Sequence, residues 1–349
     1  MQLLQKTIHK IEKLDEEMMA KARERMDSLI KPPKSLGKLE DIAIQLVGIT
    51  RNFNPIIDQK AVIVMAADHG VYEEGISSNP QAVTLAQTLL FPKGLTGVCA
   101  LSRVSGADVV AIDIGVKGEI PDDAGVIKRK IKNGTENMAK GPAMTREEAI
   151  KSIEVGIEIV NQETKKGINL LGTGEMGIGN TTASTAILSV LGNCDPLEIT
   201  GRGAGVGKGG IKHKVEVIRK AIEINKPNPA DGIDVLAKVG GLEIGGMAGV
   251  MLGAAANQIP VVVDGYISTV AAIIAASIEP KAKEYFIVSH ASAEPGGRMA
   301  SELLGIEPML RMDMCLGEGS GAALAFPIVE GAVSVIKHMA TFAEVGMKI

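Results

Sequence analysis

Short, mostly apolar segments alternate with helix-length segments along most of this chain. Such segments lie at residues 61–67, 109–114, 168–171, 260–263 and 286–288, and Gly, Asp or Ser follows each of them. A strand that is apolar on both faces is typical of a parallel sheet that helices cover on both sides. The sequence therefore predicts an α/β fold built on a buried parallel sheet.

The polar motifs of the chain follow these predicted strands. Right-handed crossovers place the carboxyl ends of parallel strands at one edge of the sheet, together with the loops that follow them. We therefore expect the motifs described below to form one shared site.

The two chain ends have a different pattern. Apolar residues recur at three- and four-residue spacing over residues 4–29 and predict one long helix. Pro32 and Pro33 end it, and a second helix follows through Ile49. Residues 319–345 read as helical apart from Pro327. We expect residues 1–50 and 315–349 to form a small helical subdomain beside a larger domain of residues 51–314.

One helix inside the larger domain has a clear start signal. Thr145 with Glu148 has the spacing of a capping box, which predicts a helix over residues 146–165.

Charge and composition exclude several classes of function. The net charge is −4, there is no basic block, and the chain has 3 Tyr, 5 Phe and no Trp, which argues against nucleic acid as a partner. The 3 Cys lie far apart, so neither disulfides nor a zinc site is predicted, and a reducing compartment fits. The amino terminus does not resemble a signal peptide, and the apolar stretches are too short or too interrupted to cross a membrane. We expect a cytoplasmic protein.

The segment GTGEMGIGNTT, residues 172–182, follows a predicted strand. Gly172, Gly174 and Gly177 satisfy the G-x-G-x-x-G pattern of dinucleotide-binding turns, with Asp195 about 20 residues further on. A single match of this kind is weak, so a dinucleotide site stays an alternative.

The second half of the same segment favours a phosphate site. Gly179 delays the next helix, which Asn180, Thr181 and Thr182 then open with side-chain donors and free backbone N–H groups. A helix amino terminus of this kind binds phosphate. A tight turn with an N-cap is the structural alternative.

Residues 201–210, GRGAGVGKGG, form a second glycine-rich segment. It resembles a phosphate-binding P-loop only superficially, because Arg202 and Gly209 occupy positions that need Gly and Ser or Thr. We predict a flexible loop that donates backbone N–H groups, with a lysine such as Lys214 beyond it. A solvated surface loop is the alternative.

Asp68 and His69 stand together at the end of the first predicted strand. Adjacent Asp and His residues suit general-base catalysis or metal binding. No second His or Cys lies at ligand spacing, so the sequence predicts no metal site. A tight turn, in which Asp68 binds backbone and His69 packs against it, explains the pair at least as well.

Three further motifs carry polar residues after strands. Asp264 and Gly265 follow the run PVVV, and a carboxylate there is placed to bind ribose hydroxyls. Residues 289–297, SHASAEPGG, predict a binding loop. Glu318 lies between two glycines before an apolar helix. It is either an N-cap or a general base facing an apolar pocket, where desolvation would raise its pKa.

A set of ordered segments carries a family resemblance: KPPKSLGKLE, AADHGVYEEGISSNPQAVT, GTGEMGIGNTT, NKPNPADGIDVLAKVGG, VVVDGYIS, SHASAEPGG and LGEGSGAALA. Together, over nearly the whole chain, they resemble the nicotinate-nucleotide–dimethylbenzimidazole phosphoribosyltransferases. The resemblance implies a Rossmann-like domain, a small domain made from both chain ends, and a homodimer.

The resemblance also implies a reaction in the assembly of the cobalamin nucleotide loop. Nicotinate mononucleotide and 5,6-dimethylbenzimidazole, or a related base, would give an α-ribazole phosphate, nicotinate and a proton, without cofactor or metal. Position by position, Glu318 matches the general base of the family, and Glu175 and Lys214 match further polar residues of its active site.

The remaining matches divide into two groups. The phosphate and ribose are held in the family at positions that correspond to Gly177, Asn180, Thr181, Gly203, Gly205 and Ser292. The residues beside the base are Asn79, Gln87 and Leu316. Their motifs predict that Gly179, Asp264 and Gly265 also bind the nucleotide.

The chain departs from the family pattern at three positions. Lys34 stands where Gly is usual, Cys315 where Arg is frequent, and Asn79 where Ser or an aromatic residue is expected beside the base. The native base therefore stays open among benzimidazoles, purines and phenols. A nicotinamide-dependent dehydrogenase and a non-catalytic nucleotide sensor also stay open as alternatives.

Overall fold

The computed structural model describes residues 2–347 and contains a six-stranded sheet in the order β3-β2-β1-β4-β5-β6. Every neighbouring pair in it is parallel. Its strands are β1 (Lys60–Ala67), β2 (Asp108–Gly115), β3 (Ile127–Lys128), β4 (Leu170–Met176), β5 (Val261–Val263) and β6 (Phe286–Val288). This is the Rossmann order, in which the direction of the crossovers reverses between β1 and β4. The predicted α/β class and parallel sheet are confirmed.

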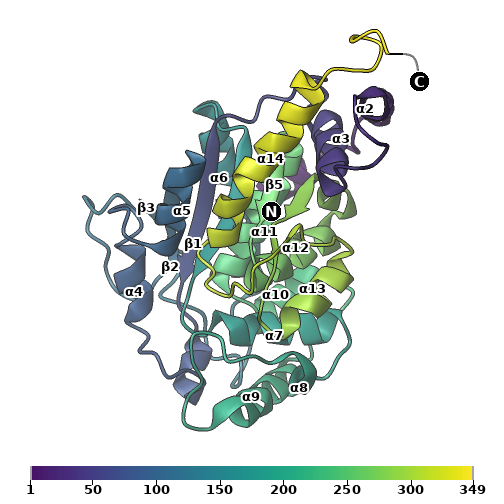
Figure 1. Cartoon of the computed structure of the whole chain (residues 1–349). Helices are drawn as coiled ribbons and strands as arrows, with labels where there is room; N and C mark the ends of the chain where they lie inside the picture. Colours follow the sequence, from purple (N-terminus) through teal and green to yellow (C-terminus); the bar gives the residue numbers. More distant parts are fainter. Residues whose placement is uncertain (1, 348–349) are drawn as a thin grey trace.

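The apolar strands are buried because helices cover the sheet on both faces. Ile63 and Met65 of β1 point into one core, and Val62 and Val64 point into the other. The first core includes side chains of α6 (Arg146–Lys165), α7 (Asn180–Leu191), α9 (Gly210–Asn225), α10 (Gly232–Val239), α11 (Leu242–Ala256) and α12 (Tyr266–Ile278). The second includes side chains of α2 (Glu16–Ser28), α3 (Lys38–Thr50), α5 (Gly97–Ser105) and α14 (Ser320–His338). Figure 1 shows α14 crossing this second face.

Apart from α1, which is described next, the other elements are short segments between the main strands and helices. They are the helices α4 (Val83–Thr88), α8 (Pro196–Ile199) and α13 (Gly296–Leu304), the 3-10 turns Gly70–Glu74 and Pro280–Tyr285, and the parallel pair β7 (His290–Ala291) and β8 (Leu310–Arg311).

The prediction of one long amino-terminal helix is wrong. The chain forms α1 (Gln2–Ile8), leaves the helix, and starts again at α2, where Asp15 accepts a hydrogen bond from the backbone N–H of Met18 at 3.0 Å. Leu4 belongs to the core of the first face and Met26 to that of the second. The break lets α1 pack against α6 while α2 packs against α3.

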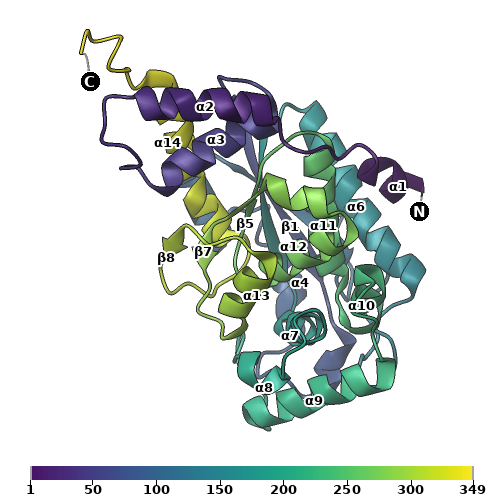
Figure 2. The same ribbon diagram turned by 90° about the vertical axis from the view of Figure 1, so that its right-hand side faces the viewer.

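The chain ends meet only in part. Figure 2 shows α2 and α3 beside α14, whereas α1 lies against α6. Leu29 and Thr341 pair as an antiparallel bridge next to these helices. The division into residues 1–50 with 315–349 and residues 51–314 stays a prediction.

Helix α14 differs from its prediction at both Pro327 and its end. It continues through Pro327 and stops at His338, before Val345. By length and composition it could cross a membrane, but 56% of the relevant window is buried inside the protein. A core helix passes the same test, and α14 packs on the sheet as one.

The predicted capping box at α6 is confirmed. Thr145 Oγ1 accepts from the N–H of Glu148 at 3.1 Å, and Glu148 Oε2 accepts from the N–H of Thr145 at 2.8 Å.

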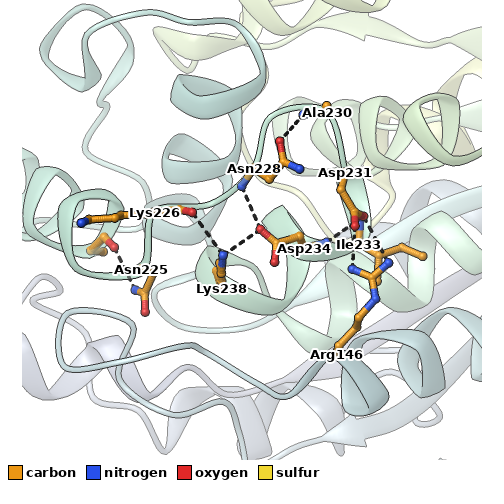
Figure 3. A network of polar contacts seen from close by, with 10 residues as sticks. Arg146, Asn225, Lys226, Asn228, Ala230, Asp231, Ile233, Asp234 and Lys238 are labelled. Carbon is orange, nitrogen blue, oxygen red and sulfur yellow. Dashed lines mark hydrogen bonds and ion pairs between the residues drawn. The ribbon is translucent and has the colours of Figure 1, made fainter.

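The motif NKPNPADGID is a structural connection between α9 and α10 (Figure 3). Asp231 accepts from the N–H groups of Ile233 and Asp234 and pairs with Arg146, the first residue of α6, at 2.8 Å. Lys238 pairs with Asp234 at 3.0 Å and donates to the carbonyl of Lys226 at 3.1 Å. The network ties the starts of α6 and α10 together, and none of its residues lines the cavity described below.

Candidate active site

A cavity of about 280 Å³ collects most of the predicted site residues. It lies where loops leave β4, β5 and β6, beside the β1–β4 reversal at which Rossmann-like sheets bind ligands. Its lining includes Asn79, Gln87, Glu175, Gly177, Asn180, Thr181, Gly203, Asp264, Gly265, Ser292, Leu316 and Glu318. The remaining predicted residues, Gly179, Gly205 and Lys214, line a niche of about 30 Å³ that also contains Gly177, Asn180 and Thr181. The structure therefore brings the predicted residues together in two adjoining spaces.

Strand β4 is longer than predicted and takes up the first two glycines of the G-x-G-x-x-G match. A Cβ on Gly174 would lie 2.2 Å from the carbonyl oxygen of Glu318, and one on Gly172 would lie 3.0 Å from the Cβ of Ala322. These glycines let the start of α14 approach the sheet, and they do not form a turn. Asp195 caps α8 and pairs with Arg219 at 2.7 Å. The dinucleotide interpretation thereby loses its basis.

The start of α7 forms one wall of the niche. The helix begins at Asn180, as predicted, after Gly179 with a φ of +99°. Lys214 of α9 donates to Thr181 Oγ1 at 2.8 Å and to the carbonyl of Gly201 at 3.2 Å. Burial lowers the pKa of Lys214 to about 8. A helix amino terminus beside a buried lysine suits a phosphate group.

The glycine-rich loop of residues 201–210 is attached to the segment before α4. Ser77 and Val206 form an antiparallel bridge, and the Asn79 side-chain amide donates to the carbonyl of Ala204 at 2.7 Å. A Cβ on Gly207 would lie 1.8 Å from the carbonyl oxygen of Gly75, so this approach requires glycine. The loop is therefore held against its neighbour, although Lys208 itself is exposed.

Glu318 is buried at 5% exposure and is held from two sides. Its Oε1 accepts from the side-chain amide of Gln87 at 2.6 Å, and its Oε2 accepts from the N–H of Val98, near the start of α5, at 3.1 Å. Gly319, not Glu318, occupies the N-cap position of α14, so the N-cap interpretation is wrong. Glu318 has a φ of +63°, an uncommon conformation for a non-glycine residue, and it directs the carboxylate toward Gln87.

Asp264 has a structural partner that the sequence did not reveal. Its Oδ1 accepts from the N–H groups of Gly321 and Ala322 at 2.7 and 3.2 Å, and its Oδ2 accepts from Gly319 at 3.1 Å. A carboxylate has about four acceptor positions, so three of them serve the start of α14. Burial raises the pKa of Asp264, against the effects of His290 and these N–H groups. Ribose binding by Asp264 stays a prediction, and the carboxylate has at most one acceptor position left for it.

Glu175 lies at the end of β4 beneath the loop that carries Glu318. Burial, together with the nearby carboxylates of Asp264 and Glu243, raises the pKa of Glu175 to about 8. The Asn180 side-chain amide donates to its Oε2. Glu175 is therefore mostly protonated at pH 7 and can donate as well as accept a hydrogen bond.

Asp68 and His69 lie outside the lining of the 280 Å³ cavity. Asp68 Oδ2 accepts from the N–H of Lys117, in the loop after β2, at 2.7 Å. His69 Nε2 contacts Glu243 Oε1 of α11 at 2.7 Å, and both side chains are at most 1% exposed. The pair thus has structural partners, but they come from the loop after β2 and from α11 and not from its own turn.

Among the lining residues that the sequence did not single out, three have aromatic or ionisable side chains. Tyr266, His290 and Glu294 all contribute to its wall. His290 and Glu294 belong to SHASAEPGG, whose place after a strand marked it as a binding loop without showing which side chains face the cavity. Tyr266 directly follows Asp264 and Gly265, and its position after a predicted strand was the one signal in the sequence that it lies at the site.

Comparisons with known proteins show the family of this chain. Residues 11–347 match a family described as phosphoribosyltransferase. The nicotinate-nucleotide–dimethylbenzimidazole phosphoribosyltransferase of Alkaliphilus metalliredigens is 67% identical over 100% of both chains, and the enzyme of that name from Clostridioides difficile is 55% identical over 99% of both. The crystal structure of CobT from Thermus thermophilus superposes with a TM-score of 0.91 at 40% identity, covering 95% of this chain and 99% of that one. The chain belongs to the nicotinate-nucleotide–dimethylbenzimidazole phosphoribosyltransferase family.

Proposed function

We propose that this protein transfers the phosphoribosyl group of nicotinate mononucleotide to a benzimidazole-type base. The products are an α-ribazole phosphate, nicotinate and a proton, and the reaction serves the nucleotide loop of cobalamin. The observation that carries this proposal is the position of Glu318 in the same cavity as the start of α7, which adjoins the Lys214 niche.

The nucleotide phosphate is assigned to the niche between α7 and α9. Backbone N–H groups at the start of α7 and the ammonium group of Lys214 would bind its oxygens. Gly203 and Gly205 lie on the facing loop, where the absence of side chains leaves room for the phosphate and ribose. Phosphate binding at this distance from the reacting bond supplies remote binding energy for the reaction.

The base is assigned to the end of the cavity lined by Gln87, Leu316 and Glu318. One nitrogen of the base attacks C1′ of the ribose on the face opposite nicotinate, so the β-nucleotide becomes an α product. The C1′–N bond to nicotinate breaks, and its electron pair neutralises the pyridinium nitrogen. The proton on the far nitrogen of the base moves to the Glu318 carboxylate.

Much of the catalytic effect then comes from placement of the two substrates. The leaving group loses its positive charge as the bond breaks, so the reaction does not depend on an additional acid at that nitrogen. Holding the base and the nucleotide in one cavity makes their encounter effectively intramolecular. Asn79, which departs from the family pattern, donates a hydrogen bond to the carbonyl of Ala204. It thereby connects the base end of the cavity to the glycine-rich loop at the nucleotide end.

Incubation with nicotinate mononucleotide and a panel of bases tests the proposal. The panel contains 5,6-dimethylbenzimidazole, benzimidazole, adenine and phenol, and mass spectrometry detects the α-riboside phosphates and the released nicotinate. We expect base-dependent release of nicotinate, and the base with the highest kcat/KM identifies the preferred acceptor. Binding of the nucleotide without nicotinate release for every base would favour a sensor instead.

We also propose a cytoplasmic homodimer. The support is the resemblance of the whole chain to the family. Light scattering of the purified protein after size exclusion gives its mass directly. A mass equal to one 36.4 kDa chain at micromolar concentration would contradict the dimer.

A further inference from the structure

Glu294 places a carboxylate in the wall of the cavity, between β7 and α13. Its backbone is held on both sides, because its N–H donates to Ser292 Oγ at 3.3 Å and its carbonyl accepts from Gly297 at 2.8 Å. Its Oε2 atom is buried and has no hydrogen-bond partner among residues 2–347. Gly201 lies against this oxygen, so the ligand-facing oxygen is Oε1, which is neither buried in the same way nor bonded to a donor in the described part of the chain. An acceptor oxygen without a protein partner in a cavity wall is placed to contact a ligand.

The side chain lies at the nucleotide end of the cavity. A Cβ on Gly201 would come within 2.0 Å of Glu294 Oε2, so Gly201 makes room for the carboxylate. The carbonyl of Gly201 accepts from Lys214, the lysine of the phosphate niche. The charge of Glu294 opposes the lowering of the Lys214 pKa by burial, as expected for groups that are close together. Glu318, in contrast, contacts Gln87 and Val98.

The chemistry of the substrates limits what can bind the Glu294 carboxylate, because an ionised carboxylate only accepts hydrogen bonds. At neutral pH nicotinate mononucleotide carries an ionised carboxylate, a largely dianionic phosphate and a pyridinium ring without N–H. Its two ribose hydroxyls are therefore its principal donors. The N–H of the incoming base is already assigned to Glu318.

We propose that Glu294 accepts a hydrogen bond from a ribose hydroxyl of the nucleotide and thereby selects ribonucleotides over their deoxy forms. The inference rests on the proposed function for the identity of the nucleotide. It assigns to Glu294 the role that the sequence had suggested for Asp264, whose carboxylate instead holds the start of α14.

The test compares nicotinate mononucleotide with its 2′-deoxy and 3′-deoxy analogues. Wild type, Glu294→Gln, Glu294→Ala and the matched control Glu302→Gln are assayed; Glu302 is an exposed acid on α13 that pairs with Arg298. We expect the wild type to lose about 10- to 100-fold in kcat/KM with one of the analogues, mainly through KM. Glu294→Ala loses a similar factor with the normal nucleotide and no further factor with that analogue. Glu302→Gln behaves as wild type.

A second measurement separates this inference from the proposed reaction. Calorimetry measures binding of the same nucleotides in the absence of base. It requires no turnover, so the nucleotides can be compared even if no product forms. The unliganded Glu294→Gln protein should keep about the wild-type melting temperature, because no group among residues 2–347 hydrogen-bonds the Glu294 Oε2 atom. Full discrimination against both analogues in Glu294→Ala, by binding and by turnover, would overturn the assignment.

Discussion

The side-chain amide of Gln87 donates to Oε1 of Glu318 across 2.6 Å and joins residues that are 231 positions apart in the chain. The other carboxylate oxygen accepts from the N–H of Val98 at 3.1 Å. Each oxygen of a carboxylate has about two acceptor positions, so each one keeps a position for a proton from the substrate. The carboxylate is thus oriented from α4 and α5 before the base arrives.

The first prediction concerns Glu318 itself. Glu318→Gln keeps the shape of the side chain but cannot take a proton, so kcat should fall by ~10²–10⁴-fold. The affinity for nicotinate mononucleotide should remain, because the phosphate niche is untouched. Steady-state assays and calorimetry measure the two effects, and wild-type turnover would remove Glu318 from the mechanism.

Gln87→Leu tests the orientation of that carboxylate. The change removes one donor and leaves the Val98 N–H in place, so we expect kcat to fall by about tenfold, the value of one hydrogen bond to a charged group. The KM for the nucleotide should stay near its wild-type value, because Gln87 faces the base end. A change in nucleotide KM alone would show that Gln87 has a different role.

Lys214 predicts a pH dependence of nucleotide binding. Its pKa of about 8 means that it loses its proton as the pH rises through 8, whereas a bound phosphate favours the protonated form. Affinity for nicotinate mononucleotide should therefore decrease above pH 8, by up to about tenfold per unit. The phosphate itself is already doubly ionised there, since its second pKa is about 6. Lys214→Met should bind more weakly at pH 7 and lose this dependence, which titrations from pH 7 to 9.5 would show.

Asp264→Ala should act mainly on stability. The change removes the acceptor for three N–H groups at the start of α14 and leaves them buried. We expect a loss of about 3 kcal/mol in the free energy of unfolding, measured by urea denaturation. Asp264→Asn keeps one acceptor oxygen and should lose less. Unchanged stability with a raised nucleotide KM would instead support ribose binding by Asp264.

Glu175 predicts how stability changes with pH. Its pKa is about 8 in the folded protein and near 4.5 when exposed, so the folded state binds more protons between these values. Stability from this group is greatest below pH 4.5 and decreases as the pH rises toward 8. Glu175→Gln does not titrate, so its melting temperature relative to wild type should be higher at pH 8 than at pH 5. Equal differences at both pH values would show that Glu175 has an ordinary pKa.

Local signals predicted the elements that depend on neighbouring residues. The buried strands, the capping box of Thr145 and Glu148, and the start of α7 at Asn180 all follow from period, propensity and caps. The break between α1 and α2 was missed because apolar spacing continues through it, while α1 packs against α6 and α2 against α3. The sequence predicted a turn at Gly172 and Gly174, because glycine weakens a strand. The structure shows that glycine is needed there because the start of α14 lies close to β4.

By itself the sequence determined the fold class and the family, and it predicted most of the polar residues that line the cavity, because apolar period and ordered motifs are properties of the chain alone. Only the tertiary structure decided which partner each polar side chain has. Asp264 serves α14, Glu318 is held by α4 and α5, and Glu294 faces the cavity. The physical reason is that hydrogen bonds and desolvation act over a few ångströms in space, and those neighbours come from segments far apart in the chain.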